Sequence, residues 1–259
     1  MQISHLPSLD ARYWMVVALI TILGSNAGDF VSDRFDTATV LDVHVPVVAA
    51  LLLAVLWFEP RDTSASHRCY WFALLLVPMT SNDLAGLVMS GAPVGRIAII
   101  SCLLLALVST FLIARSDAMH AVASNMMLRP KPNLPLTDAS YWLGMLIASV
   151  LGTTASDWLT GTEGLSDGLA LPIAGVPALA AIAAFHLLPA RFRFILYWVA
   201  IVLLNAAATA AGHFLAWSPY VGIGLPLSLV VPALVLAAIA LLGRRSLRRR
   251  PPAWLNRHG

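Results

Sequence analysis

Long apolar stretches alternate with short polar segments along the whole chain. An α-helix rises about 1.5 Å per residue, so about 20 apolar residues cross a hydrocarbon core of roughly 30 Å. Stretches that approach or exceed this length predict an all-α fold, a polytopic transmembrane helical bundle of about eight spans. We expect the spans at 12–32, 43–58, 69–89, 97–114, 139–160, 169–188, 195–217 and 223–243, of which the second is the shortest.

The composition supports a membrane protein. Of the 259 residues, 59% are hydrophobic and 11% are charged, and the mean hydropathy is +0.81. Soluble globular proteins carry about 25% charged residues. No sizeable soluble domain is therefore expected.

Basic residues distinguish the two sides of the membrane. The segments after odd-numbered spans offer only Arg34 and Arg96, whereas the other basic residues of the connecting segments follow even-numbered spans. Because cytoplasmic loops are rich in Lys and Arg, we expect both termini in the cytoplasm and the protein in a bacterial inner membrane. The net charge of +3 then reflects orientation, and no nucleic-acid partner is expected. The residues after even-numbered spans are Arg61, Arg68, Arg115, Arg129, Lys131, Arg191, Arg193 and the tail RRSLRRR.

The dipeptide Tyr-Trp marks a repeated unit of two helices. It stands at the start of every odd-numbered span, with separations of 57, 71 and 56 residues. Both residue types favour the membrane interface, so the dipeptides by themselves indicate an aromatic belt on the cytoplasmic side. Units with an even number of spans enter the membrane in the same direction, which predicts four parallel repeats. The dipeptides are Tyr13-Trp14, Tyr70-Trp71, Tyr141-Trp142 and Tyr197-Trp198.

The longest of these separations indicates a boundary in the middle of the chain. A polar, Pro-containing linker at 116–138 is expected between a first membrane half, 1–115, with repeats 1 and 2, and a second half, 139–243, with repeats 3 and 4. Residues 244–259 form a basic cytoplasmic tail. The sequence leaves open whether the repeats surround a pseudo-fourfold axis or pair as two halves.

An ionisable residue recurs at one position of the repeat. The residue fifteen positions after the Trp is Asp29, Asp157 and His213 in units one, three and four. In unit two the same count reaches Gly86, but Asp83 lies three residues earlier, about one helical turn away and on nearly the same face. Fifteen residues of helix span about 22 Å, so we expect these groups in the outer part of the membrane.

These ionisable residues form a candidate cation site. Charged side chains in membranes normally face a bundle interior or a wet cavity and often mark ion pathways. Carboxylates with one imidazole suit a divalent cation such as Mn²⁺ or Fe²⁺, and the same groups relay protons without a metal. The candidate metal ligands are Asp29, Asp83, Asp157 and His213, and the candidate substrate-pathway residues are Asn26, Asn82, Thr153, Thr154 and Thr209.

Two functions are compatible with these residues. The repeated acids favour transport or permeation of a small cation, either a divalent metal or a proton. The alternative is a non-transporting scaffold or sensor, because polar residues also hold membrane helices together. The chain has no recognisable enzyme motif and identifies no cofactor. Lipid and a small cation are the expected partners, and homo-oligomer formation stays open.

The repeated pattern resembles a family of bacterial membrane-anchored proteins built from four copies of a two-helix repeat of unknown function. The resemblance extends from about Tyr13 to Leu242 and implies a fold without a reaction. Where members often carry Glu four residues before the first Asp, this chain has Ser25, and His213 replaces the Asp of the fourth unit. The best-matched residues are Gly24, Gly28 and Asp29, and Gly152, Thr153, Thr154 and Asp157.

Overall fold

The computed structural model describes residues 6–35, 39–58, 68–91, 95–124, 135, 137–161 and 165–248. Within these residues every regular element is helical and no strand occurs, so the predicted all-α fold is confirmed. Three of the loop cations used to predict the orientation, Arg61, Arg129 and Lys131, lie outside the described residues, as does the tail from residue 249 onward.

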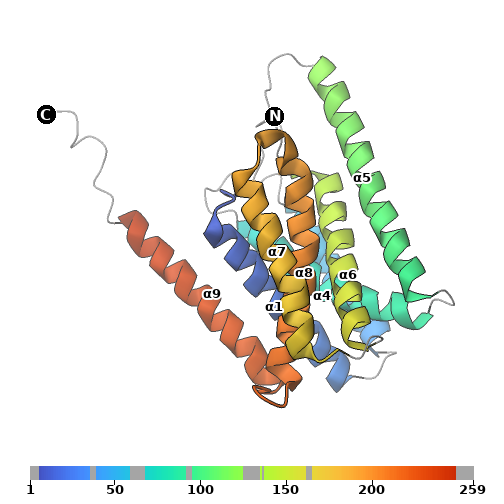
Figure 1. Cartoon of the computed structure of the whole chain (residues 1–259), viewed down its shortest axis with the longest axis vertical. Helices are drawn as coiled ribbons and strands as arrows, with labels where there is room; N and C mark the ends of the chain where they lie inside the picture. The colour runs from blue at the N-terminus through green and yellow to red at the C-terminus, as the bar shows by residue number, and fades with distance from the viewer. Residues whose placement is uncertain are drawn as a thin grey trace, which may run out of the picture.

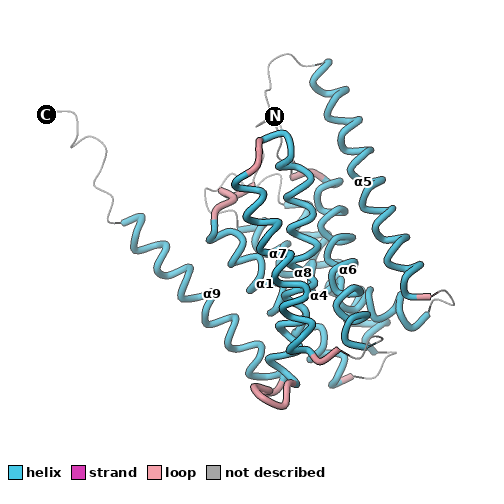
Figure 2. Tube along the Cα trace, viewed as in Figure 1, coloured by secondary structure: helices cyan, strands magenta, loops and turns pink. Residues whose placement is uncertain are grey.

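Each of the eight predicted spans coincides with a helix (Figures 1 and 2). The helices are α1 (Ala11–Arg34), α3 (Val45–Phe58), α4 (Arg68–Gly91), α5 (Arg96–Ser124), α6 (Ala139–Gly161), α7 (Asp167–Leu187), α8 (Arg193–Trp217) and α9 (Leu225–Arg248). A π-helix, η1 (Val40–His44), leads into α3, and a 3₁₀ turn, η3 (Ala190–Phe192), leads into α8. Residues 116–124, predicted as linker, continue α5.

Six of these helices are long and apolar enough to cross a membrane, judged by length and composition alone. They are α1, α4, α5, α7, α8 and α9. The other two helices, α3 and α6, do not meet these criteria, each for a different reason. α3 has 14 residues, whereas α6 has 23 but carries a run of hydroxyl-bearing residues.

Matching side-chain caps begin two of the helices that start with Tyr-Trp. Asp10 Oδ1 accepts a hydrogen bond from the backbone N–H of Tyr13 at 2.9 Å. Asp138 Oδ1 accepts one from the backbone N–H of Tyr141, also at 2.9 Å. A carboxylate at this position satisfies a free N–H group and favours the positive end of the helix dipole. The local sequence therefore starts α1 and α6 in the same register.

The four helices that begin with Tyr-Trp form the inside of the bundle. α1 packs against α4 and α8, and α6 packs against the same two helices, so their order around the ring is α1, α4, α6, α8. Their Tyr-Trp ends meet one another, which makes the four helices parallel.

Each remaining helix covers the inner helix of the following unit. α3 packs on α4, α5 on α6 and α7 on α8, and α9 closes the circle by packing on α1. Figure 1 shows α5 and α9 on opposite sides of the inner helices. The two helices of a unit therefore do not form an isolated hairpin, because the outer helix of each unit finds its main partner in the next one.

Four tyrosine hydroxyls close the centre of the inner ring. Each hydroxyl lies at hydrogen-bond distance from both neighbouring hydroxyls, and each Tyr is at most 2% exposed. A hydroxyl has one proton to donate and can also accept, so a closed ring satisfies all four groups. The distances are 2.9 Å for Tyr13 to Tyr70 and 2.8 Å for Tyr70 to Tyr141, Tyr141 to Tyr197 and Tyr197 to Tyr13.

The tryptophans that follow these tyrosines pack around the tyrosine ring. Each Trp lies edge-on to its own Tyr, with ring centroids 5.1 to 5.3 Å apart, and tilted against the Tyr of the preceding unit around the circle. Trp14, Trp142 and Trp198 are buried. The aromatic-belt interpretation is therefore wrong, because the dipeptides build the core of the bundle.

Two glycines allow equivalent close approaches between inner helices. A Cβ on Gly24 of α1 would lie 2.8 Å from Pro78 Cβ of α4, and one on Gly152 of α6 would lie 2.6 Å from Asn205 Cβ of α8. Both glycines stand ten residues after a Trp, and both contacted residues stand seven after one. Units one and two thus meet in the same register as units three and four.

Replacing Tyr141 with Phe is expected to lower the free energy of unfolding by about 1–3 kcal/mol, because two neighbouring buried hydroxyls each lose a partner. The control is Tyr220→Phe, since Tyr220 is 90% exposed, and we expect it to change stability by less than about 0.5 kcal/mol. Thermal unfolding in detergent measures both. Replacing all four ring tyrosines with Phe should cost less than four single replacements, because no hydroxyl is then left unpaired. A strictly additive loss would contradict the ring.

Replacing Gly152 with Ala is expected to destabilise the protein by about 1–3 kcal/mol, because the added methyl group has no space between α6 and α8. Gly175 in α7 is the matched control, since a Cβ there would meet nothing within 4 Å. Gly175→Ala should be neutral or stabilising by up to about 1 kcal/mol through helix propensity. Equal effects of the two substitutions on the unfolding midpoint would refute the close approach.

Candidate functional site

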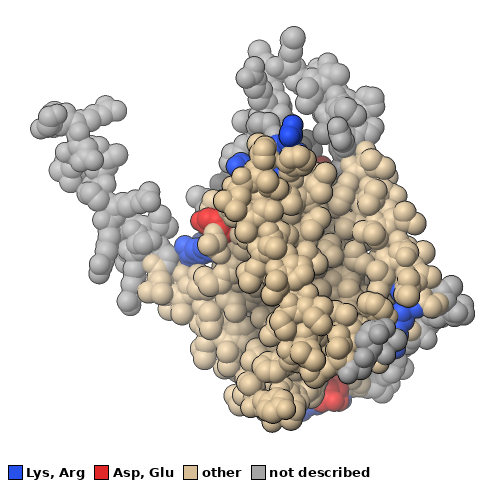
Figure 3. All heavy atoms as spheres, viewed as in Figure 1, with Lys and Arg blue, Asp and Glu red and all other residues tan. Residues whose placement is uncertain are grey.

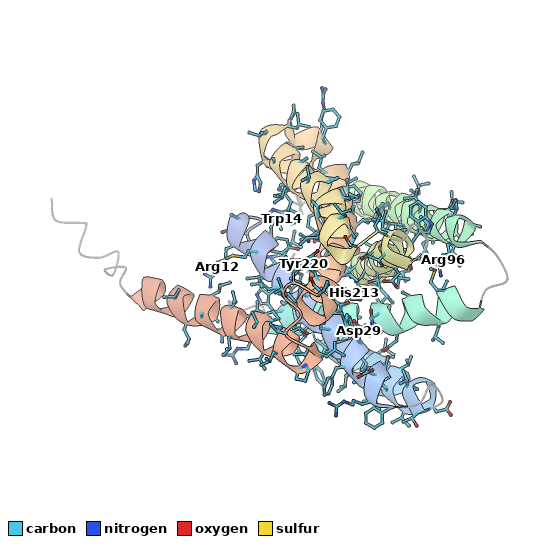
Figure 4. The ribbon with its side chains drawn as sticks, turned by 60° about the horizontal axis from the view of Figure 1, so that its bottom comes forward. Arg12, Trp14, Asp29, Arg96, His213 and Tyr220 are labelled. Atoms are coloured by element: carbon cyan, nitrogen blue, oxygen red, sulfur yellow. The ribbon has the colours of Figure 1, made fainter. Side chains whose placement is uncertain are left out.

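The C-terminal ends of the inner helices bring ionisable side chains together around Asp29 of α1. Asn82 of α4 donates from Nδ2 to Asp29 Oδ1 at 2.9 Å. On the opposite side, His213 Nε2 of α8 lies 3.4 Å from Asp29 Oδ2, an ion-pair distance without hydrogen-bond alignment. Figure 4 shows Asp29 and His213 beside each other at this end of the bundle. The repeat position thus places an acid and a histidine in contact across the interface of α1 and α8.

Asp157 of α6 is a second carboxylate that acts on His213. α8 packs against both α1 and α6, and Asp157 interacts electrostatically with His213, Asp29 and Arg96. One imidazole therefore lies at ion-pair distance from one carboxylate and interacts electrostatically with a second, from a different helix. On the fourth inner helix the equivalent residue is Gly86, where a Cβ would meet nothing within 4 Å. Three of the four inner helices therefore carry an ionisable residue at this position, and the fourth carries a glycine with free space beside it.

Asp83 has a different partner from the other three residues. Its Oδ2 lies 3.2 Å from Nδ1 of His44, the last residue of η1, and its side chain is 1% exposed. Asp29 still acts on it electrostatically. Three residues along a helix leave a side chain about 60° short of a full turn. This difference directs Asp83 toward the outer segment of the preceding unit.

The described residues contain no group of three His, Cys, Asp or Glu side chains that could hold a metal ion. The metal site remains a prediction from the sequence for Asp29, Asp83, Asp157 and His213. In the structure, both acid–histidine contacts are made within the protein instead. A proton needs no such group of ligands, because one carboxylate or one imidazole binds it.

Four of the five predicted pathway residues connect neighbouring elements through hydrogen bonds. The fifth, Thr154, is fully buried, and its Oγ1 has no hydrogen-bond partner among the described residues. Contacts of this kind are typical of polar residues that hold membrane helices together. The hydrogen-bonded pairs are Thr153 with Thr209 at 3.4 Å, Asn26 with Ser228 at 2.9 Å, and Asn82 with Asp29 at 2.9 Å.

A second polar layer lies closer to the tyrosine ring and connects all four inner helices. Asn205 Oδ1 accepts hydrogen bonds from Thr21 at 3.3 Å and from Ser149 at 3.0 Å. Ser149 Oγ is also 2.8 Å from Ser81 Oγ of α4. This layer was not predicted from the sequence, although Thr21, Ser149 and Asn205 each stand seven residues after a Trp. Counting seven residues from each Trp, instead of the fifteen that located the ionisable position, would have located this layer.

Buried apolar side chains separate this polar layer from the tyrosine ring. They stand four residues after each ring Tyr and are at most 2% exposed. Together with the ring, they fill the N-terminal half of the inner bundle. The layer consists of Val17, Leu74, Met145 and Ile201.

Comparisons with known proteins returned no family model, no curated protein and no solved structure that matches this chain. The resemblance to the bacterial repeat family therefore stays a prediction.

Replacing Asn82 with Leu is expected to lower the free energy of unfolding by about 1–3 kcal/mol at neutral pH, because a charged acceptor loses its donor. The control is Thr160→Val near the same end, because the Thr160 hydroxyl donates to a carbonyl of its own helix, that of Ser156 at 3.2 Å. Thermal unfolding at neutral pH checks both variants. An equal loss for the two variants would contradict the contact of Asn82 with Asp29.

Proposed function

We propose that this chain is a bacterial inner-membrane protein with eight membrane-crossing helices and cytoplasmic termini. Its helices form four parallel two-helix repeats around a pseudo-fourfold axis. The cyclic packing of the inner helices and the shared register of their tyrosines support this arrangement. The surface supports a membrane location. On the face seen in Figure 3, the charged side chains of the described residues lie around the margin, and the centre of the face shows none.

The low hydropathy of α6 is compatible with this arrangement. Most residues from Gly144 to Ser156 are buried against other helices. Ser149 has hydrogen-bond partners on both α4 and α8. Polar groups are tolerated at membrane depth where neighbouring helices satisfy them. A helix in the centre of the bundle can therefore cross the membrane without a lipid-facing apolar surface.

For the function, we propose a non-conducting membrane sensor that binds a small cation, in the simplest case a proton, at the end formed by Asp29, Asp157 and His213. The observation that carries this proposal is the ion-pair distance of 3.4 Å between His213 Nε2 and Asp29 Oδ2, with Asp157 interacting electrostatically with both residues. A histidine changes its charge near neutral pH. Excess negative charge at membrane depth is costly. Uptake of a cation by this trio is therefore favourable, and its charge state follows pH.

The tyrosine ring and the apolar layer beside it favour a sensor over a transporter. Both consist of fully buried side chains and occupy the bundle between the polar layers and the N-terminal ends of the inner helices. A cation entering from the acidic end would meet hydroxyl and amide groups only as far as the layer of Asn205. Transport, the first function expected from the sequence, would require both closed layers to open.

The test combines thermal unfolding across pH with ion flux in liposomes. The ion pair of His213 and Asp29 exists only while the imidazole is protonated, so raising the pH from about 6 to about 8 should lower the unfolding midpoint of the wild type. His213→Gln should reduce this pH dependence, and Asp33→Asn, at an exposed site one turn beyond Asp29, should leave it intact. Proteoliposomes with entrapped pH and divalent-metal dyes should show no flux above protein-free liposomes.

Two outcomes would overturn the proposal. If His213→Gln keeps the full pH dependence of the wild type, the trio does not take up protons in this range. If the proteoliposomes show a cation flux that Asp157→Asn abolishes, the protein transports that cation and the sensor function is refuted.

A further inference from the structure

A third polar layer lies between the layer of Asn205 and the acidic end of the inner helices. Thr21 and Ser149 both donate to Asn205 around the axis of the bundle, and the residue four positions after each of the three also carries a hydroxyl. Four residues are about one helical turn, so these hydroxyl residues lie on the same face of their helices, one turn nearer the acids. They are Ser25 of α1, Thr153 of α6 and Thr209 of α8.

The fourth inner helix contributes an amide to the same level. Asn82 of α4 stands eleven residues after its Trp, as the three hydroxyl residues do. Its Nδ2 donates to Asp29 Oδ1, which leaves the lone pairs of its amide oxygen for another partner. Each inner helix therefore carries an uncharged, oxygen-bearing side chain at this level, which we name the inner oxygen layer.

Two hydroxyl groups at this depth are buried without a hydrogen-bond partner among the described residues. Ser25 is 1% exposed, and so is Ser156, which lies on the face of α6 that carries Ser149, seven residues earlier. A buried hydroxyl can bond to the carbonyl one turn back in its own helix, as Thr80 does to Leu76 at 3.0 Å. Ser25 and Ser156 make no such bond. Because an unsatisfied buried hydroxyl is costly, these two oxygens indicate a ligand between the inner helices.

The spacing and the chemistry of the oxygens indicate which ligand fits. The Oγ1 atoms of Thr153 and Thr209 are 3.4 Å apart, whereas hydroxyl–hydroxyl bonds are usually about 2.8 Å long. Two oxygens at right angles around an ion of the size of Ca²⁺ or Na⁺, each about 2.4 Å from it, lie about 3.4 Å apart. Divalent ions take carboxylate ligands, and the donors of this layer are uncharged, which favours the monovalent ion. Asp29 and Asp157, one turn farther out, offset its charge.

We propose that the inner oxygen layer binds one dehydrated Na⁺ ion that enters from the acidic end. The ion joins the four inner helices and stabilises the bundle at this level. The apolar layer and the tyrosine ring beyond it remain closed. The site does not depend on a change in protonation and stands whether or not the acidic end takes up protons. Its ligands are side-chain oxygens of Ser25, Asn82, Thr153, Ser156 and Thr209.

Thermal unfolding in detergent tests the site in NaCl, KCl and choline chloride at equal ionic strength and constant pH. A ligand that binds the native state stabilises it by mass action, so the wild-type midpoint should rise with Na⁺ concentration and change far less with K⁺ or choline. Thr209→Val keeps the shape of the side chain without the hydroxyl. It should raise the Na⁺ concentration needed for half of the shift by about tenfold or more, whereas Thr209→Ser should retain the response.

Ser25→Ala is the second variant, because it removes a hydroxyl that has no partner within the described residues. It should weaken the response to Na⁺ without lowering the midpoint in choline chloride, whereas a residue that only packs helices would lower the midpoint equally in all three salts. The control is Thr80→Val, since the buried Thr80 hydroxyl is bonded within its own helix. This control should keep the full response to Na⁺.

Equal midpoints of the wild type in the three salts would overturn the sodium site and assign the unpartnered hydroxyls to ordered water. A response to Na⁺ that is unchanged in both Thr209→Val and Ser25→Ala would also overturn it, because the ion would then bind elsewhere. His213→Gln, the variant that tests proton uptake, should keep the response. If it loses the response while Thr209→Val retains it, the ion binds at the acidic end and the inner site is refuted. The two proposals can therefore fail separately.

Discussion

A closed ring of four tyrosine hydroxyls determines how the inner helices meet. Each of the four must present its hydroxyl at the same height and toward the same centre, because any helix that slipped by one residue would leave two buried hydroxyls without a partner. This requirement fixes the register of α1, α4, α6 and α8 at their N-terminal ends. The glycine contacts, the layer of Asn205 and the carboxylates at the far end therefore follow in the same register.

The polar layers become more ionisable with distance from the ring. Hydroxyls alone occupy the ring, hydroxyls and one amide occupy the layer of Asn205, and carboxylates with histidines occupy the far end. This order has a physical reason, since uncharged groups can be satisfied by direct partners in a dry interior, whereas charged groups cost less near water. The gradient in chemistry therefore indicates which end of the bundle communicates with solvent.

Hydropathy and the spacing of residues after each Trp predicted much of the fold, because both are local properties of the sequence. Apolar length predicted eight helices, and the distance from each Trp to the ionisable residue predicted the repeat. The role of the Tyr-Trp pair could not be read in the same way, since an aromatic residue at a helix end suits a membrane surface as well as a core. The partner of Asp83 was equally out of reach. His44 belongs to the preceding unit, and only the cyclic packing of outer helices on following units brings the two together.

The order of the circle has a consequence for how the protein assembles during synthesis. Of the described helices α1 is made first, yet α9, which covers it, is made last. Tyr13 likewise lies next to Tyr197, 184 residues later in the chain. Contacts of such long sequence separation form slowly. α1 must therefore remain in the membrane with one side uncovered, and with Tyr13 short of a hydroxyl partner, until the final units have been inserted. A nascent chain that stalls before α8 exposes the polar residues of this uncovered side to lipid or to any helix that can cover them.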